Sequence, residues 1–356
     1  MTIKTWMIYG AAGYSGRLIT EKALEKSLQP ILAGRDSAPI RELAEELGLE
    51  LRLFNLNDSA HMLEQLQGID AVVSCAGPFS ATARPMIEAC IKAGTHYFDI
   101  TGELDVFEFA HSVKIDEAAR AAGIAVCPGI GFDVIPTDCI ARTLADELPD
   151  ATELHLGFSG DVAVSPGTAK SMIEGFASAT KARRNGKIVD IPLQVSDIDY
   201  GNGPQQSMSI SWGDVSTAFY TTGIPSITVS WPASNKAIRQ ARIAGYIRPL
   251  LRLNRVQNFL KKQVDKRVCG PGAEQRDKSP VMVWGEARNA AGETVTARIQ
   301  TANGYSVTCD APPLIIEHLL ENDIPAGSHT PAQLFGKYFV CTVPGSSSIE
   351  ISRARR

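Results

Sequence analysis

Three glycines near the start of the chain have the spacing of a phosphate-binding turn. The turn comprises Gly10, Ala11, Ala12, Gly13, Tyr14, Ser15 and Gly16. It follows a short apolar run and opens a helical pattern, where glycines permit a tight turn and a close backbone approach to a pyrophosphate on the helix N-terminus. The alternative is a plain strand–helix turn. We predict instead that a dinucleotide binds at Gly10, Ala12, Gly13, Tyr14, Ser15 and Gly16.

The end of the second predicted strand bears on which dinucleotide binds. An NAD site carries an acid here, on the ribose diol, whereas this chain has Gly34 followed by Arg35. Gly34 leaves room, and the Arg35 guanidinium suits a 2′-phosphate. Two alternatives stay open, because Asp36 is an acid one residue later and because Arg35 also suits a solvated turn. We predict NADP as the cofactor, with NAD the less favoured choice.

Two further loops complete the predicted cofactor contacts. Asn55 follows the third strand and is placed for the adenine edge, with helix capping as the equal alternative. Ala76, Gly77 and Pro78 follow the fourth strand, where a small rigid loop lets the nicotinamide ribose approach. A tight turn stopped by proline is the alternative for that loop, and Cys75 before it is more typical of a buried apolar residue than of a reactive thiol.

Acids at the ends of the next two strands are the candidates for handling a proton. Glu103 ends a DITGE segment after the fifth strand, and Asp133 ends a CPGIGFD segment after the sixth. Both are expected to face the cleft in which an open α/β sheet binds its ligand. The alternatives are a helix-terminal charge for Glu103 and a structural role before Pro136 for Asp133. We predict Glu103 and Asp133 as catalytic residues.

Other catalytic constellations are missing from the sequence. The six histidines are dispersed, without an HExxH motif or matching carboxylate spacing, so we predict no metal site. No GxSxG nucleophile motif occurs, nor the Ser–Tyr–Lys spacing of short-chain dehydrogenases. In the second half, residues 165–168 (SPGT) are either an anion site or a helix cap. The uncharged stretch 217–222 is either a cavity wall or core.

The elements that must position these residues fall into two patterns. Up to residue 135, six short apolar runs alternate with helical stretches, which indicates βαβ units, a parallel sheet and helices on both faces. Beyond that point strand patterns cluster, with a hairpin across residues 280–301. The sequence predicts an α/β fold: a doubly wound Rossmann-type NADP domain over 1–135, and over 136–356 an α+β substrate and dimerisation domain on a mostly antiparallel sheet. The C-terminal segment either stays there or packs back on the first domain.

Composition excludes several classes of protein. Of 356 residues, 44% are hydrophobic and 21% are charged, and 35 basic against 39 acidic residues leave a net charge of −4. A disordered chain, a disulfide scaffold and a nucleic-acid binder are therefore not expected. Seven cysteines without a CxxC pair suit a reducing compartment, and no signal-peptide pattern opens the chain. We predict a cytoplasmic protein.

One segment departs from the acidic average. Residues 234–267 contain ten basic residues and one acid. Apolar residues recur there at near-helical spacing, and Pro249 is expected to kink or split the helix. Three interpretations stay open: a helix on an anionic membrane surface, a lid that steers an acidic or carrier-bound substrate, and a helix packed on the second domain. We favour the packed helix.

Several segments together resemble a known family. GAAGYSG, LAGRD, VVSCAGPF, HYFDITGE and CPGIGFDVIPTDC are similar to motifs of the saccharopine dehydrogenase-like oxidoreductases. SPGTAKSM and WGDVSTAFYTTGIPSITV resemble the branch that includes trans-acting enoyl reductases. The resemblance implies a Rossmann NADP domain, an α+β domain, a homodimer and hydride transfer to a C=N or C=C bond. It does not identify the substrate, because substrates differ widely across this family.

We therefore expect an NADP-dependent oxidoreductase that acts on an unidentified small or acyl substrate. The alternative is a catalytically silent NADP-binding or sensing protein on the same fold, because no obvious proton donor stands out. A single-turnover assay with imines and enoyl thioesters separates these two functions.

Overall fold

The computed structural model describes residues 2–160, 179–251, 253, 256, 263 and 280–354. By its internal contacts the chain divides into two units. Unit 1 comprises Met1–Ile135 with Tyr305–Gly336, and unit 2 comprises Pro136–Gly304 with Lys337–Arg356, so each unit is built from two stretches of sequence. The SPGT loop at 165–168 lies outside the described residues, as do most positions of the basic segment beyond 251.

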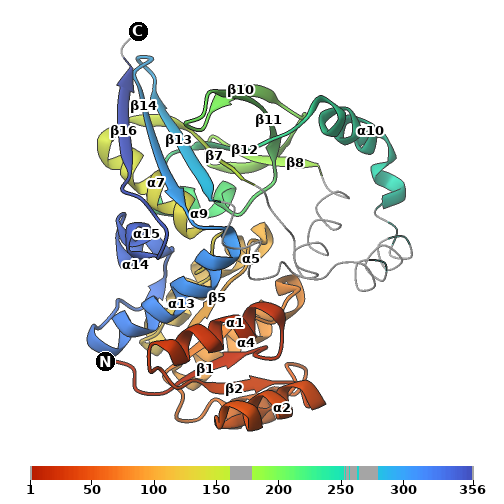
Figure 1. The fold of residues 1–356 in the computed structure, drawn as a ribbon, viewed down its shortest axis with the longest axis vertical. Helices are drawn as coiled ribbons and strands as arrows, with labels where there is room; N and C mark the ends of the chain where they lie inside the picture. Colours follow the sequence, from red (N-terminus) through yellow and green to blue (C-terminus); the bar gives the residue numbers. More distant parts are fainter. Residues whose placement is uncertain are drawn as a thin grey trace. The chain divides into compact units, whose positions relative to one another are not determined.

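Within the described residues, unit 1 contains a seven-stranded sheet in which every pair is parallel. Its strands are β1 (Trp6–Tyr9), β2 (Ile31–Gly34), β3 (Leu51–Leu53), β4 (Ala71–Ser74), β5 (His96–Asp99), β6 (Ala125–Cys127) and β15 (Gly327–Ser328). They lie in the order β15-β6-β5-β4-β1-β2-β3, a doubly wound order with β15 added beside β6. Figure 1 labels β1, β2 and β5 of this sheet. The predicted Rossmann-type sheet is confirmed.

The helices of unit 1 differ in part from those that the sequence predicts. They are α1 (Tyr14–Glu25), α2 (Ala38–Leu47), α3 (Ser59–Gln65), α4 (Phe79–Ala93), α5 (Leu104–Ala110), α6 (Val113–Ala122), α13 (Gly304–Glu321) and α14 (Pro331–Phe335). The sequence predicts one helix over 105–122, whereas α5 and α6 are separate. Ser112 explains the break, because its hydroxyl donates to the Phe109 carbonyl oxygen at 2.7 Å and its extended backbone begins α6. The sequence also predicts a helix over 313–321, whereas α13 begins earlier, at Gly304.

Within the described residues, unit 2 contains a nine-stranded sheet. Its strands are β7 (Ala151–Ser159), β8 (Thr180–Arg184), β9 (Lys187–Ile191), β10 (Val195–Asp199), β11 (Pro204–Ile210), β12 (Ser226–Pro232), β13 (Val281–Asn289), β14 (Thr294–Thr301) and β16 (Glu350–Ala354). Seven lie in the order β10-β11-β12-β7-β13-β14-β16, and β8 pairs with β12 and β9. Among the pairs formed by the described strands, β12–β7 alone is parallel, so the predicted mostly antiparallel sheet is confirmed.

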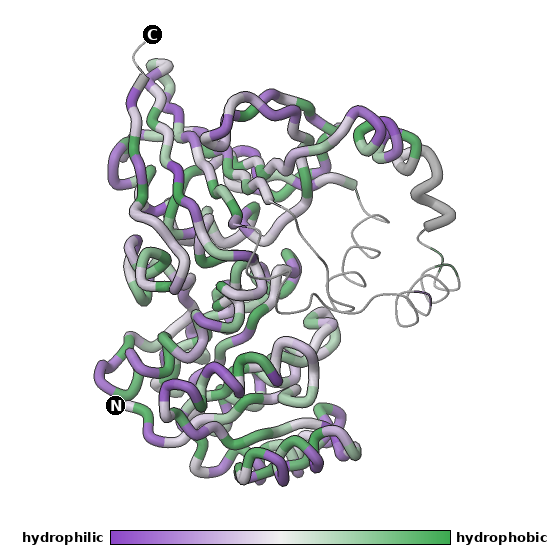
Figure 2. Tube along the Cα trace, viewed as in Figure 1, coloured by the Kyte–Doolittle hydropathy of each residue, from purple (hydrophilic) through white to green (hydrophobic). Residues whose placement is uncertain are grey.

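One face of this second sheet packs on helices, and the other carries polar residues beside a small apolar cluster of Ile198, Tyr200 and Trp284. The described helices of unit 2 are α7 (Ile135–Glu147), α9 (Asp214–Thr222), α10 (Asn235–Leu251) and α15 (Phe339–Thr342). A Cβ on Gly285 of β13 would lie 2.7 Å from Ile140 and from Leu144, so α7 approaches the sheet where a side chain is missing. The stretch 217–222 forms most of α9 and includes buried threonines. Figure 2 shows long hydrophobic stretches along the strands of unit 1 and a more mixed pattern along those of unit 2.

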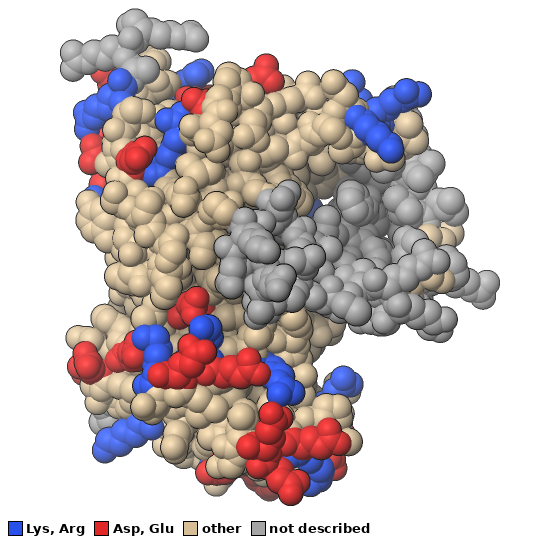
Figure 3. Space-filling model, viewed as in Figure 1, with Lys and Arg blue, Asp and Glu red and all other residues tan. Residues whose placement is uncertain are grey.

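Helix α10 is the described part of the basic segment. It continues to Leu251, two residues beyond Pro249, where the sequence predicted a kink or a split. Ile238 is buried whereas Ile243 is 51% exposed, and Figure 3 shows basic side chains gathered over this helix. None of the helices in the described ranges is long and apolar enough to cross a membrane.

The glycine turn yields a prediction about folding. A Cβ on Gly16 would overlap the carbonyl oxygen of Gly10 and lie 2.9 Å from the Cα of Ala11. Because both neighbours are backbone, Gly16→Ala should lower the free energy of unfolding by about 2 kcal/mol. At Gly13 the nearest atom is 3.2 Å away and φ is −72°, so Gly13→Ala should cost much less. Urea unfolding measures both variants, and equal midpoints would contradict this account.

Candidate functional site

The glycine turn packs directly on the loop after β4. Gly10 has a φ of +84°, which favours glycine, and a Cβ on it would lie 2.9 Å from the Ala76 nitrogen. The N–H groups of Gly10 and Ala11 donate to the Ala33 carbonyl oxygen at 2.8 and 3.3 Å. The loops after β1, β2 and β4 thus meet at one edge of the sheet, where open α/β sheets bind ligands.

Helix α1 begins at this turn without a side-chain cap from the described residues. Its N-cap is Gly13, whose backbone is extended. Ala12 and Gly13 are exposed, while Tyr14 and Ser15 are partly buried. The first N–H groups of a helix need an acceptor, and the helix dipole favours an anion there. The α1 N-terminus therefore fits a pyrophosphate.

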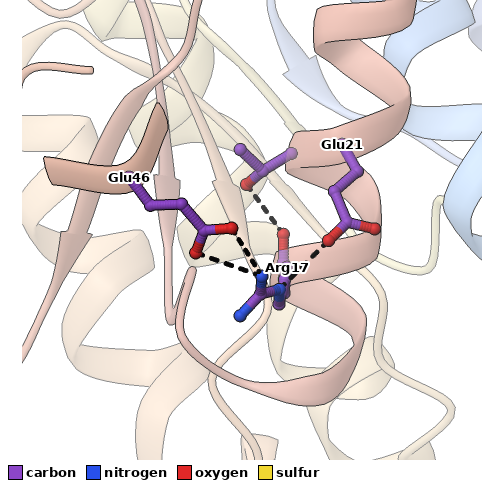
Figure 4. Close-up of polar contacts among 5 residues, drawn as sticks. Arg17, Glu21 and Glu46 are labelled. Atoms are coloured by element: carbon purple, nitrogen blue, oxygen red, sulfur yellow. Dashed lines mark hydrogen bonds and ion pairs between the residues drawn. The ribbon is translucent and has the colours of Figure 1, made fainter. Parts of the chain in front are cut away.

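Arg17, one turn into α1, is held by two acids. Its guanidinium donates to Glu21 Oε1 at 3.0 Å and to both carboxylate oxygens of Glu46 in α2 at 3.2 Å (Figure 4). The Arg17–Glu46 pair joins α1 to α2, and the Arg17–Glu21 pair lies within α1. Both pairs are exposed and contribute little to stability, but they engage the Arg17 charge. Arg17 is therefore not counted among the candidate phosphate ligands.

At the end of β2, Arg35 and Asp36 have different surroundings. Asp36 forms a two-point ion pair with Arg41, at 2.7 and 2.9 Å, so its carboxylate is engaged. Arg35 is exposed. Burial raises the pKa of the Tyr9 hydroxyl, and the nearby Arg35 charge opposes that rise. Arg35 thus offers an accessible guanidinium beside the strand end where the adenosine ribose is expected.

Asn55 lies on the next loop of the same sheet edge. Its side-chain oxygen accepts a hydrogen bond from the Asn57 N–H at 3.1 Å, and the residue is exposed. Helix α3 is capped instead by Asp58, which accepts from the His61 N–H. The capping role that the sequence allowed for Asn55 therefore belongs to Asp58.

The loop Ala76–Pro78 is anchored at both ends. The Cys75 N–H donates to the Tyr9 carbonyl oxygen at 2.7 Å, and the Thr82 hydroxyl donates to the Ala76 carbonyl oxygen at 2.5 Å. Positions 77 and 78 are exposed, so the loop presents its backbone to a ligand. Burial raises the pKa of the Cys75 thiol, which keeps the thiol protonated and poorly nucleophilic.

Glu103 binds the start of α4. Its carboxylate oxygens accept hydrogen bonds from the N–H groups of Phe79 at 2.9 Å and Ser80 at 2.6 Å. The alternative for Glu103 in the sequence was a charge at the N-terminus of the helix that follows it. The structure places its carboxylate instead at the N-terminus of α4, the helix that directly follows the Ala76–Pro78 loop.

Asp99, at the end of β5, is a buried carboxylate that the sequence interpretation did not single out. Its Oδ1 accepts from the N–H groups of Thr101 at 3.0 Å and Gly129 at 2.8 Å, and its Oδ2 accepts from the Tyr97 hydroxyl at 2.6 Å. Burial raises its pKa to about 6. These bonds tie the loop after β5 to the loop after β6. The sequence feature that could have identified Asp99 is its position at the end of a predicted strand, as the first residue of the DITGE segment.

Asp133 lies against the loop that carries Glu103. A Cβ on Gly102 would lie 2.5 Å from Asp133 Oδ2, so the carboxyl packs on the backbone of that loop. Burial raises the pKa of Asp133 to about 7. The structure thus brings the two acidic candidates onto adjacent loops and gives them different environments. A carboxyl with a pKa near neutral is suited to exchange a proton at neutral pH.

Helix α13 supplies residues that no local motif marked. The Tyr305 ring meets the Tyr14 ring edge to face, with centroids 5.4 Å apart. The Thr308 hydroxyl accepts a hydrogen bond from the Phe132 N–H at 3.1 Å. One helix therefore contacts both the glycine turn and the loop of Asp133. Among the residues that the structure describes, no group of three or more His, Cys, Asp and Glu side chains could hold a metal ion.

Comparisons with known proteins agree with this geometry. Residues 10–121 match the model of a family described as NAD(P)H-binding. The chain is 34% identical over 217 residues to a trans-acting enoyl reductase of Mycobacterium leprae, which covers 56% of this chain and 51% of that protein. It is 26% identical over 204 residues to a human saccharopine dehydrogenase-like oxidoreductase, which covers 50% and 47%. The chain spans about half the length of these curated relatives.

A solved structure shares the fold. Apo saccharopine dehydrogenase (L-Glu forming) from Saccharomyces cerevisiae superposes with a TM-score of 0.62, covering 99% of this chain and 100% of that chain at 12% identity. At that identity the likeness shows the fold alone. The sequence relatives confirm the resemblance that the motifs predicted.

The pKa of Asp133 makes stability depend on pH. The unfolded carboxyl loses its proton near 3.8 and the folded one near 7, so the free energy of unfolding falls as pH rises through that window. Asp133→Asn removes this titration. The free energy of unfolding of the variant, relative to that of wild type, should therefore rise by at least about 1 kcal/mol between about pH 5 and about pH 8. Asp105→Asn, an exposed control in α5, should show no gain. Parallel profiles for wild type and D133N in urea unfolding would refute the assignment.

Proposed function

Because this chain resembles saccharopine dehydrogenase-like oxidoreductases and trans-acting enoyl reductases in sequence, we propose that it is an NADP-dependent oxidoreductase. It transfers hydride to or from a C=N or C=C bond of a small or acyl substrate. The observation that carries the proposal is the glycine turn that begins α1, packed against the Ala76–Pro78 loop inside the NAD(P)H-binding match.

The residues at the sheet edge fit a dinucleotide in a definite order. The N–H groups at the start of α1 hold the pyrophosphate. Arg35 meets the 2′-phosphate, because Asp36 is paired with Arg41 and so does not repel it. Asn55 takes the adenine side, and the Ala76–Pro78 backbone takes the nicotinamide ribose. When bound, the nicotinamide supplies or accepts the hydride.

Asp133 is the residue that we propose for the proton. Hydride added to one atom of a C=N or C=C bond leaves the other atom in need of a proton. The Asp133 carboxyl, with its pKa raised to about 7, gives that proton and recovers it from water; the reverse reaction runs the same steps backwards. Glu103 acts through position, because its bonds to Phe79 and Ser80 set the start of α4 and with it the preceding loop.

The wider setting follows from the resemblance. We propose a cytoplasmic homodimer that binds neither nucleic acid nor membrane, with the basic segment packed on the second domain. Its exposed residues on α10, Arg239 and Arg242, also suit the alternative of steering an acidic substrate.

The pyrophosphate contact is tested at Gly13. Among the described residues other than its two chain neighbours, only the Gly10 carbonyl oxygen lies within 4 Å of a Cβ placed there, at 3.2 Å, so Gly13→Val should keep the fold while its side chain blocks the α1 N-terminus. Titration with NADPH, followed by the change in protein fluorescence, should show no saturable binding. Thermal unfolding without cofactor serves as the control. If the variant is folded and still binds NADPH with wild-type affinity, the glycine loop is a plain strand–helix turn and the proposed pyrophosphate contact is wrong.

Cofactor preference is tested at Arg35. Arg35→Ala should weaken NADPH binding by about 1–3 kcal/mol, the range of a charge-assisted hydrogen bond, and leave NADH binding unchanged. Arg120→Ala removes an exposed, ion-paired arginine elsewhere in unit 1 and should affect neither cofactor. Equal losses for NADPH and NADH in R35A would exclude a 2′-phosphate contact.

Activity is tested by single turnover. Enzyme loaded with NADPH is mixed with imines or enoyl thioesters, and the loss of nicotinamide absorbance is followed. Asp133→Asn should slow the transfer by about 100-fold or more, with NADPH affinity retained. Glu103→Gln should slow it less, because one side-chain oxygen still accepts a backbone hydrogen bond. No turnover with any substrate, despite tight NADPH binding, would favour a silent NADP-binding protein.

A further inference from the structure

Unit 2 contains a polar cavity of about 300 Å³ on the face of its sheet away from α7. Its walls come from β7, β8, β12 and β13. Register places His155 of β7 between Thr228 of β12 and Glu286 of β13, and places Glu153 one row along beside Arg288. Glu153 and His155 alternate with the buried leucines of β7, so they lie on the outward face together with their cross-strand partners.

Two of the cavity's charges are matched and two are not. Arg288 lies 3.7 Å from Glu286 as an ion pair. Arg184 donates to the Ile227 carbonyl oxygen at 3.2 Å and to the Thr228 hydroxyl at 2.8 Å. Over the ranges that the structure describes, no carboxylate lies within ion-pair distance of Arg184, and no cationic group lies within that distance of Glu153. A partly buried cation and an acid thus line one cavity without touching.

The balance of charge selects the kind of ligand. Two arginines and two glutamates line the cavity, so their formal charges cancel. Burial, and secondarily the Arg184 charge, lower the pKa of His155 to about 4, and the neutral ring bonds to the Ser230 hydroxyl at 2.8 Å. A simple anion would be attracted by Arg184 but repelled by the two glutamates. A simple cation would be attracted by Glu153 but repelled by the two arginines. A zwitterion satisfies both unmatched charges.

We propose that this cavity binds a small zwitterion of the free amino acid class. Its carboxylate pairs with Arg184, its ammonium group pairs with Glu153, and the hydroxyls of Ser226 and Thr228 line the space between. A volume of about 300 Å³ is at the lower end for ligand pockets and is too small for a dinucleotide. The site lies wholly in unit 2, apart from the proposed cofactor site, and does not depend on the proposed oxidoreductase activity.

Binding is tested on the full chain. Saturation-transfer NMR with the standard amino acids identifies the strongest binder, and isothermal titration then measures its affinity. The same titration is run with two matched probes, the corresponding acid without its amine and the corresponding amine without its carboxylate. The zwitterion should bind at least tenfold more tightly than either. Equal binding of either probe, or no amino acid bound at millimolar concentration, overturns the proposal.

Variants place the binding in this cavity. Glu153→Gln should weaken the zwitterion at least tenfold, whereas Glu350→Gln, an exposed change on β16, should leave it unchanged. Arg184→Gln should also weaken it, and thermal unfolding checks that its lost backbone contacts have not unfolded unit 2. Undiminished amino-acid binding by E153Q would assign the ligand to another site and refute the proposal. NADPH titration of E153Q should match wild type, so failure here is distinct from failure of the proposed oxidoreductase.

Discussion

The close approach of two backbone turns is the constraint on which the candidate site depends. Gly10 sits against Ala76, and Gly16 sits against Gly10, at distances that leave no space for a Cβ. Because these contacts are backbone to backbone, they fix the α1 N-terminus relative to the loop after β4 without the freedom of side-chain rotamers. The same arrangement starts α1 at Gly13, a residue with no side chain to cap the helix, and the N-terminal end of a helix favours an anion.

Burial then differentiates three acids at the ends of β5 and β6. Asp99 loses hydration but accepts three hydrogen bonds, and its pKa rises only to about 6. Asp133, against the Gly102 backbone, is shifted to about 7. Glu103 is partly exposed and bound to two backbone N–H groups. Residues of one chemical type thus acquire separate roles, because desolvation and hydrogen bonding act on each carboxyl differently.

In the second unit, the two faces of the sheet give polar side chains different surroundings. On the helix side, Asp138 of α7 accepts a hydrogen bond from the Thr221 hydroxyl of α9, so a buried acid joins two helices. On the other side, charged and hydroxyl residues stand where strand alternation turns them outward. The helix-covered face is apolar, whereas the other face combines these polar residues with the buried cluster of Ile198, Tyr200 and Trp284.

The sequence by itself determined the type and order of most elements. The alternation of β1 to β6 with helices, the hairpin of β13 and β14, and the glycine turn all follow from patterns within a few dozen residues, where local periodicity and turn chemistry decide structure. Even the split between α5 and α6 has a local cause in Ser112, although apolar periodicity hid it.

Only the tertiary structure decided which side chains meet. Strand β15 has two residues and no propensity to mark it, and it forms because β6 offers an edge. Glu103 binds α4 rather than its own helix, and Tyr305 contacts Tyr14 across almost three hundred residues of sequence. Such contacts depend on how distant segments pack, and no local pattern encodes that packing, because its energy comes from burial shared between segments.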